Sequence, residues 1–197
     1  MSFRLGLTGS IGMGKSTTAR LFAEENCAVW DADAAVHRLY AEGGAAVTPI
    51  GTAFSDAVVD GAVSRDRLKK IIAGDAAALK RIEAIVHPLV AADRQEFLAA
   101  ANADIVVFDI PLLFETGGDA QMDAVACVTV APEIQRQRVM DRGTMSAAQF
   151  ETILAKQMPD GQKRARSDYV IVTDTLEHAR KQVQAVIRDI RDRLQDA

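Results

Sequence analysis

Eight residues near the start of the chain have the types and the spacing of a loop that binds phosphate: Gly9-Ser10-Ile11-Gly12-Met13-Gly14-Lys15-Ser16. They complete the pattern G-x-x-x-x-G-K-[ST]. The glycines allow a backbone in which successive N–H groups face one anion, and the helix expected to follow adds its unpaired N-terminal donors. Lys15 is expected to reach the β- and γ-phosphates of ATP, and the Ser16 hydroxyl to bind Mg²⁺. The residues predicted to bind ATP are Ile11, Gly12, Met13, Gly14, Lys15, Ser16 and Thr17.

Carboxylates directly follow two of the expected strands. Asp31 and Asp33 come after the apolar residues 28–30, and Asp109 ends the apolar run 105–108. Acids in such positions often cap the next helix, and this alternative stays open. Phosphoryl transfer to a hydroxyl, however, needs a carboxylate for the metal ion and a group that takes or orients the hydroxyl proton. We therefore predict that Asp109 acts on Mg²⁺ through water and that Asp33 acts on the acceptor hydroxyl.

Basic residues gather in the segment 136–166. Arg138 and Arg142 lie four residues apart, on one face of a helix expected over 132–142. A solvated surface is the usual meaning of such charge, but guanidinium groups also neutralise the charge that phosphoryl transfer spreads over oxygens. We predict that these two arginines are catalytic and belong to a lid that excludes water. The remaining basic residues are expected on the surface: Arg136, Lys156, Lys163, Arg164 and Arg166.

These groups must be positioned by a mainly parallel sheet with helices on both faces. Short apolar runs, typical of buried strands, occur at residues 3–7, 28–30, 105–108, 125–130 and 169–172. Helical patterns lie between them, over 132–142 and 146–157, and the last helix carries apolar residues on one face from Leu176 to Leu194. The alternation predicts an α/β fold with a five-stranded parallel sheet. Ligands of such sheets bind at the carboxyl ends of the strands.

The residues from Ala34 to about Leu98 have a helical character and are expected to form a cap beside the sheet. Ser64 is a candidate N-cap, Asp60-Gly61 marks a turn, and Pro88 is expected to end one helix and begin another through Leu98. The predicted organisation is a single domain, 1–197. It comprises a nucleotide-binding core over about 1–33 and 103–197, a helical insert over about 34–102 and a lid over about 136–166.

The composition is that of an ordinary globular protein, with 49% hydrophobic and 25% charged residues among 197. The net charge of −4 argues against nucleic acid as a partner. No apolar run approaches the length of a membrane helix, and the N-terminus is typical of a strand rather than a signal peptide. We expect no membrane partner, a cytoplasmic location and a monomer or small homo-oligomer. Cys27 and Cys127 lack metal-site spacing and are expected to be buried free thiols.

Several segments resemble dephospho-CoA kinases, in the same order and over nearly the whole chain. They are residues 7–17, Asp31-Ala32-Asp33, Asp60-Gly61 with Arg65, His87-Pro88, Pro111-Leu112-Leu113-Phe114-Glu115, and Arg138, Arg142 and Gln157. Many nucleotide-using proteins share the phosphate-binding loop. The Asp-Ala-Asp, His-Pro and Pro-Leu-Leu-Phe-Glu segments together are specific to this family. The chain departs from the family pattern at Ser10, Met13 and Ser55, and at Thr173-Asp174-Thr175 near the expected adenine site.

The resemblance implies transfer of the ATP γ-phosphate to the ribose 3′-hydroxyl of dephospho-CoA, the last step of coenzyme A synthesis. It implies a three-layer P-loop NTPase fold with an Arg-bearing lid and a helical insert that binds the CoA substrate, and it places Asp33 at the family's base. The residues that it implies for binding dephospho-CoA are Thr8, Asp33, His37, Arg65, His87, Pro111, Leu112, Leu113 and Glu115.

Three other kinds of protein carry such a loop. Another small-molecule or nucleotide kinase would use the insert for a different acceptor, and turnover of dephospho-CoA against nucleoside monophosphates would distinguish the two. A GTPase switch needs an Asn-Lys-x-Asp motif, but the two asparagines, Asn26 and Asn102, are followed by Cys27 and Ala103. An ATPase subunit of a larger machine is disfavoured, because no extension for partner recognition is visible.

Overall fold

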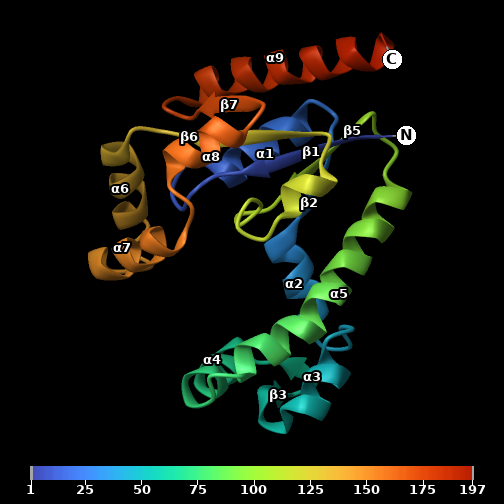
Figure 1. The fold of residues 1–197 in the computed structure, drawn as a ribbon, viewed down its shortest axis with the longest axis vertical. Coiled ribbons are helices and arrows are strands. Elements are labelled where there is room, and N and C mark those ends of the chain that lie inside the picture. Colours follow the sequence, from blue (N-terminus) through green and yellow to red (C-terminus); the bar gives the residue numbers. More distant parts are fainter. Residues whose placement is uncertain (1, 197) are drawn as a thin grey trace. The chain divides into compact units, whose positions relative to one another are not determined.

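The computed structural model describes residues 2–196 (Figure 1). The chain divides into two compact units. The first, here called the sheet unit, comprises Met1–Trp30 and Ala101–Ala197, and the second, the helical unit, comprises Asp31–Ala100. No helix within residues 2–196 combines the length and the apolar character that crossing a membrane requires.

Five parallel strands form the sheet, as predicted. They are β1 (Phe3–Thr8), β2 (Ala28–Asp31), β5 (Ile105–Asp109), β6 (Ala124–Thr129) and β7 (Tyr169–Val172). Their order is β2-β5-β1-β6-β7, so β1 is the central strand. In the register of β1 with its neighbours, Leu7 lies opposite Asp109 of β5 and Ala126 of β6. The loop after β1 therefore leaves the sheet at its centre, beside the end of β5.

The helices of the sheet unit begin and end close to the predicted positions. They are α1 (Lys15–Glu24), α6 (Pro132–Asp141), α7 (Ala147–Lys156), α8 (Asp160–Arg166) and α9 (Leu176–Gln195), with a 3₁₀ turn, η2, over Gly118–Gln121. Local capping explains two of the boundaries. Ser146 and Gln149 form a reciprocal capping box at α7, and the Thr175 hydroxyl accepts from His178 N at the start of α9. The short helix α8 was not predicted.

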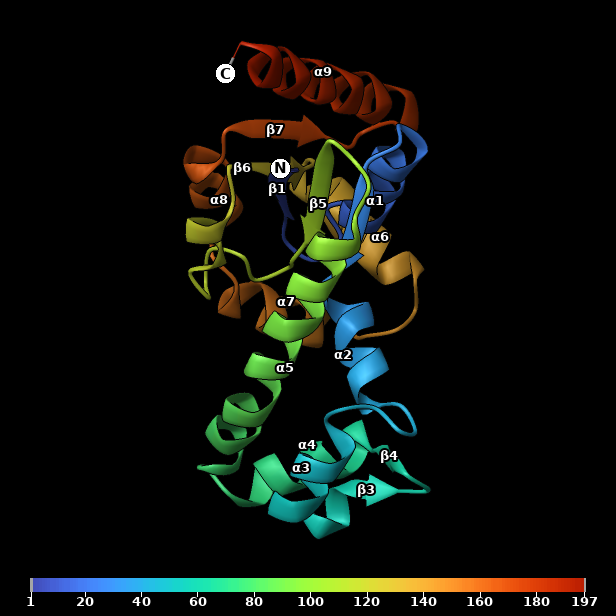
Figure 2. The same ribbon diagram turned by 90° about the vertical axis from the view of Figure 1, so that its right-hand side faces the viewer.

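The side chains of β6 alternate between the two faces of the sheet. Ala126 and Val128 pack in the main core with Phe22 of α1 and Val183 of α9. Val125 points to the opposite face, into a smaller cluster beneath the segment that follows β5. Figure 2 shows α9 lying alongside β7, which it contacts. The sheet is thus covered on both faces, which is the three-layer architecture that the sequence predicts.

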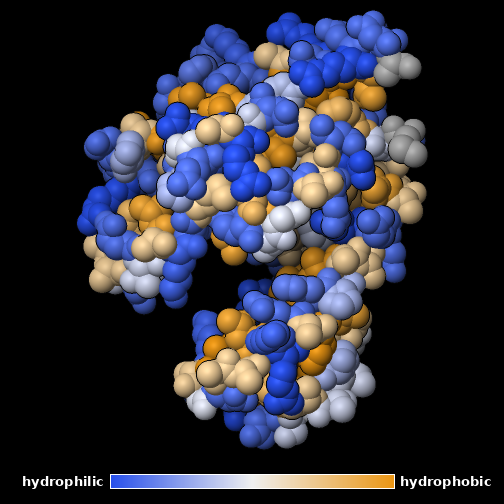
Figure 3. Space-filling model, in the orientation of Figure 1, coloured by the Kyte–Doolittle hydropathy of each residue, from blue (hydrophilic) through white to orange (hydrophobic). Residues whose placement is uncertain are grey.

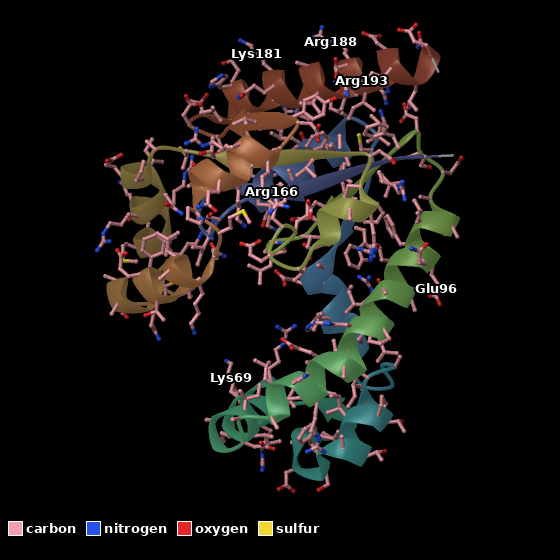
Figure 4. All side chains as sticks on the ribbon, in the orientation of Figure 1. Lys69, Glu96, Arg166, Lys181, Arg188 and Arg193 are labelled. Atoms are coloured by element: carbon pink, nitrogen blue, oxygen red, sulfur yellow. The ribbon has the colours of Figure 1, made fainter. Side chains whose placement is uncertain are left out.

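Helix α9 is strongly amphipathic. Its buried face consists of Ala179, Val183, Val186, Ile187 and Ile190. Its outer face is mostly hydrophilic in Figure 3, and Lys181 and Arg188 project from it in Figure 4, whereas the Arg193 guanidinium carbon lies 5.6 Å from the ring centroid of Tyr169 in β7. This pattern is the 3.6-residue period read from the sequence.

The helical unit has a core of its own. Its elements are α2 (Ala32–Tyr40), α3 (Val47–Ala53), the 3₁₀ turn η1 (Ser55–Ala57), β3 (Val58–Val59), β4 (Ala62–Val63), α4 (Arg65–Gly74) and α5 (Ala78–Ala100). Its buried residues are Leu39, Ala46, Ile50, Ala57, Val63, Leu68, Ile82 and Val86. The expected turn at Asp60-Gly61 is confirmed, with positive φ at both residues. The turn joins the antiparallel pair β3–β4, so the prediction of an entirely helical segment was wrong there.

The predicted helix break at Pro88 was also wrong, since α5 continues through it from Ala78 to Ala100. A proline inside a helix costs about 3 kcal/mol, because one hydrogen bond is lost and the ring meets the preceding turn. Tertiary contacts offset this cost. Val86 is buried in the core before the proline, and beyond it Asp93 accepts from Arg38 of α2 at 2.7 Å.

Two smaller expectations concern the strand end at residue 31 and the cysteines. Strand β2 ends at Asp31 and α2 begins at Ala32, so Asp33 lies in the first turn of a helix rather than at the strand end.

Cys27 and Cys127 are buried free thiols, as predicted. Burial raises the pKa of each thiol to about 11, so both stay protonated at neutral pH.

Candidate functional site

The phosphate-binding loop uses its glycines for both conformation and space. Gly12 and Gly14 have φ of 78° and 91°, in the left-handed region that favours glycine. A Cβ at Gly12 would lie 2.6 Å from Val139 Cγ2, and one at Gly14 would lie 2.9 Å from Thr173 Oγ1. Helix α1 starts at Lys15, directly after Gly14, so the last two residues of the loop form the first turn of the helix. The N-terminal donors of α1 therefore join the loop, as an anion site requires.

Lys15 and Asp109 form an ion pair in this structure. The Lys15 ammonium donates to Asp109 Oδ1, at the end of β5. The Asp109 side chain is buried, whereas Lys15 is partly open to solvent. The register of β1 with β5 explains why the two side chains are close. Asp109 lies opposite Leu7, and the loop begins two residues after Leu7, at Gly9. The structure thus brings together the loop lysine and the carboxylate predicted to act on the metal ion.

Ser16 and Thr17 lie exposed in the first turn of α1. Met13 differs from them, because its side chain is 2% exposed and its Sδ accepts from Val130 N at 3.2 Å. The backbone of Met13 is also engaged, because Met13 N donates to Ser10 O at 3.1 Å and Met13 O accepts from Thr173 Oγ1 at 2.7 Å. Thr8 is also buried, and its hydroxyl donates to Pro111 O at 3.1 Å.

The two arginines predicted to be catalytic lie at one cavity. Its volume is about 240 Å³, and Gly14, Thr17, Thr18, Arg138, Arg142, Thr173, Thr175, Leu176 and Ala179 line it. Arg138 lies in α6, and Arg142 directly follows that helix. The Arg138 guanidinium donates to Thr173 Oγ1 at 3.0 Å and also to Thr173 O. The cavity adjoins the phosphate-binding loop and the Thr173–Thr175 turn, where the sequence places the adenine.

The sequence analysis assigned no role to three residues that hold this site together. Gln135 Nε2 donates to Ile11 O at 2.7 Å, and Gln157 Oε1 accepts from Ile11 N at 3.1 Å. Thr173 Oγ1 donates to Met13 O at 2.7 Å. The resemblance includes Gln157 and the Thr173 turn but gives neither a role, and no local pattern identifies Gln135.

The segment Pro111–Glu115 is anchored to α8. Glu115 accepts from Lys163 Nζ at 2.9 Å and from Met158 N at 2.8 Å, and Lys163 also donates to Pro111 O at 3.1 Å. Lys163 is fully buried, so the prediction of a surface lysine was wrong. Its ammonium is tolerated inside because a carboxylate and a carbonyl compensate it.

This anchoring alters the Glu115 carboxyl. Burial by itself would raise its pKa, but the hydrogen bonds from Lys163 and Met158 N and the Lys163 charge outweigh burial, and the pKa is lowered.

Other side chains of this segment lie in different environments. Leu113 is buried and Leu112 is exposed, although both are predicted to bind the substrate. Arg166, labelled in Figure 4, lies with its guanidinium carbon 4.5 Å from the Phe114 ring centroid.

The remaining predicted residues lie in the helical unit. Asp31 is the N-cap of α2 and accepts from Ala34 N at 2.8 Å. Asp33 and His37 are exposed and lie one turn apart on that helix, so they share a face. Arg65 begins α4, with its guanidinium carbon 5.7 Å from the Tyr40 ring centroid. His87 is exposed on α5.

Comparison with known proteins gives a consistent family. The sequence model of the dephospho-CoA kinase family matches residues 3–178. A dephospho-CoA kinase of Ruegeria pomeroyi is 72% identical over 191 residues, which are 97% of this chain and 97% of that protein. One from Cereibacter sphaeroides is 62% identical, with 96% of each chain covered.

Solved structures agree on the fold. A crystal structure of a Thermus thermophilus protein has a TM-score of 0.85 at 31% identity and covers 95% of this chain and 97% of its own. Dephospho-CoA kinase from Campylobacter jejuni has a TM-score of 0.69 at 24% identity, with 96% and 98% covered. A shikimate kinase from Acinetobacter baumannii, at 16% identity and a TM-score of 0.54, covers 98% of this chain and 95% of its own. At these last two identities the likeness concerns the fold.

Proposed function

Because the chain belongs to the dephospho-CoA kinase family, we propose roles for its residues in that family's reaction. The chain is an ATP-dependent kinase that phosphorylates dephospho-CoA at its ribose 3′-hydroxyl and yields coenzyme A and ADP. The observation that carries this conclusion is the 72% identity to a dephospho-CoA kinase over 97% of the chain. The alternative acceptors and the GTPase alternative are thereby set aside.

On the ATP side, we assign the phosphates to the backbone of residues 11–17 and to the Lys15 ammonium. The left-handed glycines and the start of α1 at Lys15 support this assignment. Arg138 and Arg142 are assigned to the charge that develops during transfer, because both line the cavity beside Gly14. Fixed donors of this kind lower the barrier because they need no reorganisation during the reaction.

For the metal ion, we propose Mg²⁺ held by Ser16 and Asp109. Within residues 2–196 no three His, Cys, Asp or Glu side chains are grouped to bind a metal ion by themselves. A hydroxyl and a carboxylate nevertheless fit Mg²⁺, which prefers oxygen ligands and is usually bound by one or two carboxylates together with substrate phosphates. When bound, Mg²⁺ would neutralise charge on the phosphates. Asp109 is already paired with Lys15, so the Asp109 carboxylate would lie close to both the Lys15 ammonium and the Mg²⁺ ion.

On the acceptor side, we propose that Asp33 takes or orients the proton of the ribose hydroxyl. Its exposure supports the role, as does the separate engagement of Asp31 in capping α2. The other residues proposed to bind dephospho-CoA are Thr8, His37, Arg65, His87, Pro111, Leu112, Leu113 and Glu115. For Thr8, Leu113 and Glu115 the observed contacts favour an indirect part, in which they shape the Pro111–Glu115 segment.

The assembly and the location of the protein are further proposals. We propose a monomer or small homo-oligomer, which light scattering on the purified protein would determine. We also propose that the reaction takes place in the cytoplasm, where the ATP that the family uses is abundant.

Substrate choice is the direct test of the function. A coupled ADP-release assay should show turnover that depends on dephospho-CoA and exceeds that with any nucleoside monophosphate. ADP release with a nucleoside monophosphate, and none with dephospho-CoA, would contradict the conclusion.

A further inference from the structure

Three backbone groups of the phosphate-binding loop are held by side chains from outside the loop: Ile11 N, Ile11 O and Met13 O. Gln135 of α6 donates to Ile11 O, and Gln157, at the end of α7, accepts from Ile11 N. Gln135 is 4% exposed, so its amide has little access to water. Two peptide units further along the chain, Thr173 donates to Met13 O. Thr173 is 7% exposed and is itself fixed by Arg138.

These bonds have a geometric consequence for the loop's donors. In a planar trans peptide, the C=O of one residue and the N–H of the next point in opposite directions. Residues 2–196 contain no cis peptide bond. Gln135, which holds Ile11 O, therefore turns the Gly12 N–H away from α6. By the same reasoning, Thr173, which holds Met13 O, turns the Gly14 N–H away from the end of β7.

Glycine makes such external support necessary. A residue without Cβ populates positive and negative φ about equally, so peptide units beside Gly12 and Gly14 reverse at little cost unless something holds them. Each reversal would present a carbonyl oxygen where an anion needs a donor. The Ser10 hydroxyl does not supply the support, since Ser10 Oγ is buried without a hydrogen-bond partner.

We propose that Gln135 and Thr173 are positioning residues for nucleotide binding, which aim the Gly12 and Gly14 amides at the phosphates of ATP. They act through the loop carbonyls and do not touch the reacting atoms. Gln157 completes the arrangement, because it fixes the preceding peptide through Ile11 N. The proposal rests on the proposed function only in that ATP and ADP bind at this loop.

The test is ADP binding to the whole protein, measured by calorimetry without acceptor. Gln135→Met keeps the length of the side chain but has no donor, and it should weaken ADP binding about tenfold, the effect of one lost buried hydrogen bond. Steady-state kinetics should show a similar rise in KM for ATP and an unchanged KM for dephospho-CoA. The control is Gln184→Met, which removes a glutamine of α9 that donates to Glu25 Oε1 at 2.7 Å, and it should leave ADP binding unchanged.

Thr173 provides a second pair of variants. This pair tests the proposal by itself if Gln135→Met does not fold. Thr173→Val keeps the shape without the hydroxyl and should weaken ADP binding about tenfold, whereas Thr173→Ser restores the donor and should bind within about threefold of the wild type. The proposal is overturned if Gln135→Met and Thr173→Val, both folded, bind ADP within twofold of the wild type. Equal losses in Thr173→Val and Thr173→Ser would also overturn it, as would an equal rise in the KM of both substrates. A wild-type protein that binds no ADP would instead contradict the proposed function.

Discussion

At the scale of single residues, the loop lysine and its partner illustrate how the site is prepared for phosphate. Lys15 is paired with Asp109, a carboxylate with a side chain that is 1% exposed. A buried carboxylate without a counter-charge would be costly, so Lys15 stabilises Asp109 before any nucleotide binds. Arriving phosphates would compete with Asp109 for the same ammonium. Lys15 therefore affects both the loop and the proposed metal position.

Replacement of Lys15 by Ala should abolish turnover. We expect a fall of about 10²-fold or more, because the charge nearest the β- and γ-phosphate oxygens is lost. The measurement is ADP release with both substrates saturating, on a variant shown to be folded by circular dichroism. Activity near that of the wild type would mean that the loop lysine is not catalytic here.

Asp33→Asn tests the acceptor role, with Asp31→Asn as the matched variant. Asp33→Asn keeps the size of the side chain but cannot take a proton, so single-turnover transfer should fall by about 10²-fold, within the usual range for a general base. ADP should still bind. Asp31→Asn should be milder, since Asn also caps helices well and Asp31 accepts from Ala34 N. Transfer by Asp33→Asn at the wild-type rate would identify Asp33 as structural.

At the scale of elements, α8 is joined to the segment after β5 by a buried charge. Lys163 of α8 is fully buried between Glu115 and Pro111 O, and Glu115 also accepts from Met158 N, two residues before α8. The two elements are thereby fixed to each other although they lie far apart in the sequence. The prediction of Lys163 as a surface residue failed because nothing near it in the sequence reveals this partner.

Glu115→Gln should lower the free energy of unfolding by about 3 kcal/mol at pH 7, because it leaves the Lys163 ammonium buried without its carboxylate. The pKa of Glu115 is lowered in the folded state, so its contribution is complete above the ordinary value of 4.5 and is lost as the pH falls through the folded pKa. Urea unfolding should therefore show a difference between wild type and variant that shrinks as the pH drops below about 4.5.

The double variant Glu115→Gln with Lys163→Met serves as the control for this pair. It removes both charges and should recover most of the lost stability, because a buried pair replaced by neutral groups is often tolerated. If the single variant is as stable as the wild type at pH 7, the ion pair does not hold α8 in place.

At the scale of the whole molecule, the chain has two compact units with separate cores. The core of the sheet unit is built from β1, β5, β6, β7, α1 and α9, and that of the helical unit from α2 to α5 with the β3–β4 pair. The residues assigned to ATP lie in the first unit, whereas Asp33, His37, Arg65 and His87 lie in the second. Loss of packing in one unit should therefore affect one substrate more than the other.

Ile50→Ala tests this separation. Ile50 is fully buried in the helical unit, and its truncation should cost about 2–5 kcal/mol of local stability. Hydrogen exchange should become faster in residues 31–100, turnover of dephospho-CoA should fall, and ADP affinity should stay within about twofold. The matched variant is Val183→Ala in the core of the sheet unit, which should weaken ADP binding. A similar loss of ADP affinity in both variants would show that the units are not energetically separate.

The sequence by itself determined the features that depend on local pattern. Strands of the sheet followed from short apolar runs, the last helix from its hydrophobic period, the start of α4 from Ser64, and the phosphate-binding loop from a motif of eight consecutive residues. The Asp60-Gly61 turn was also correct. Each of these signals lies within a few residues of the structure that it specifies, because capping, turns and amphipathic period act over that range.

The tertiary structure decided what depends on partners distant in sequence. The helix α5 runs through Pro88 because contacts on both sides of the proline hold it, and Lys163 is buried because Glu115 lies beside it. Gln135 holds Ile11 from 124 residues away. A polar side chain has the same local pattern whether it faces water or a buried backbone group, and only the packing of elements determines which of the two it meets.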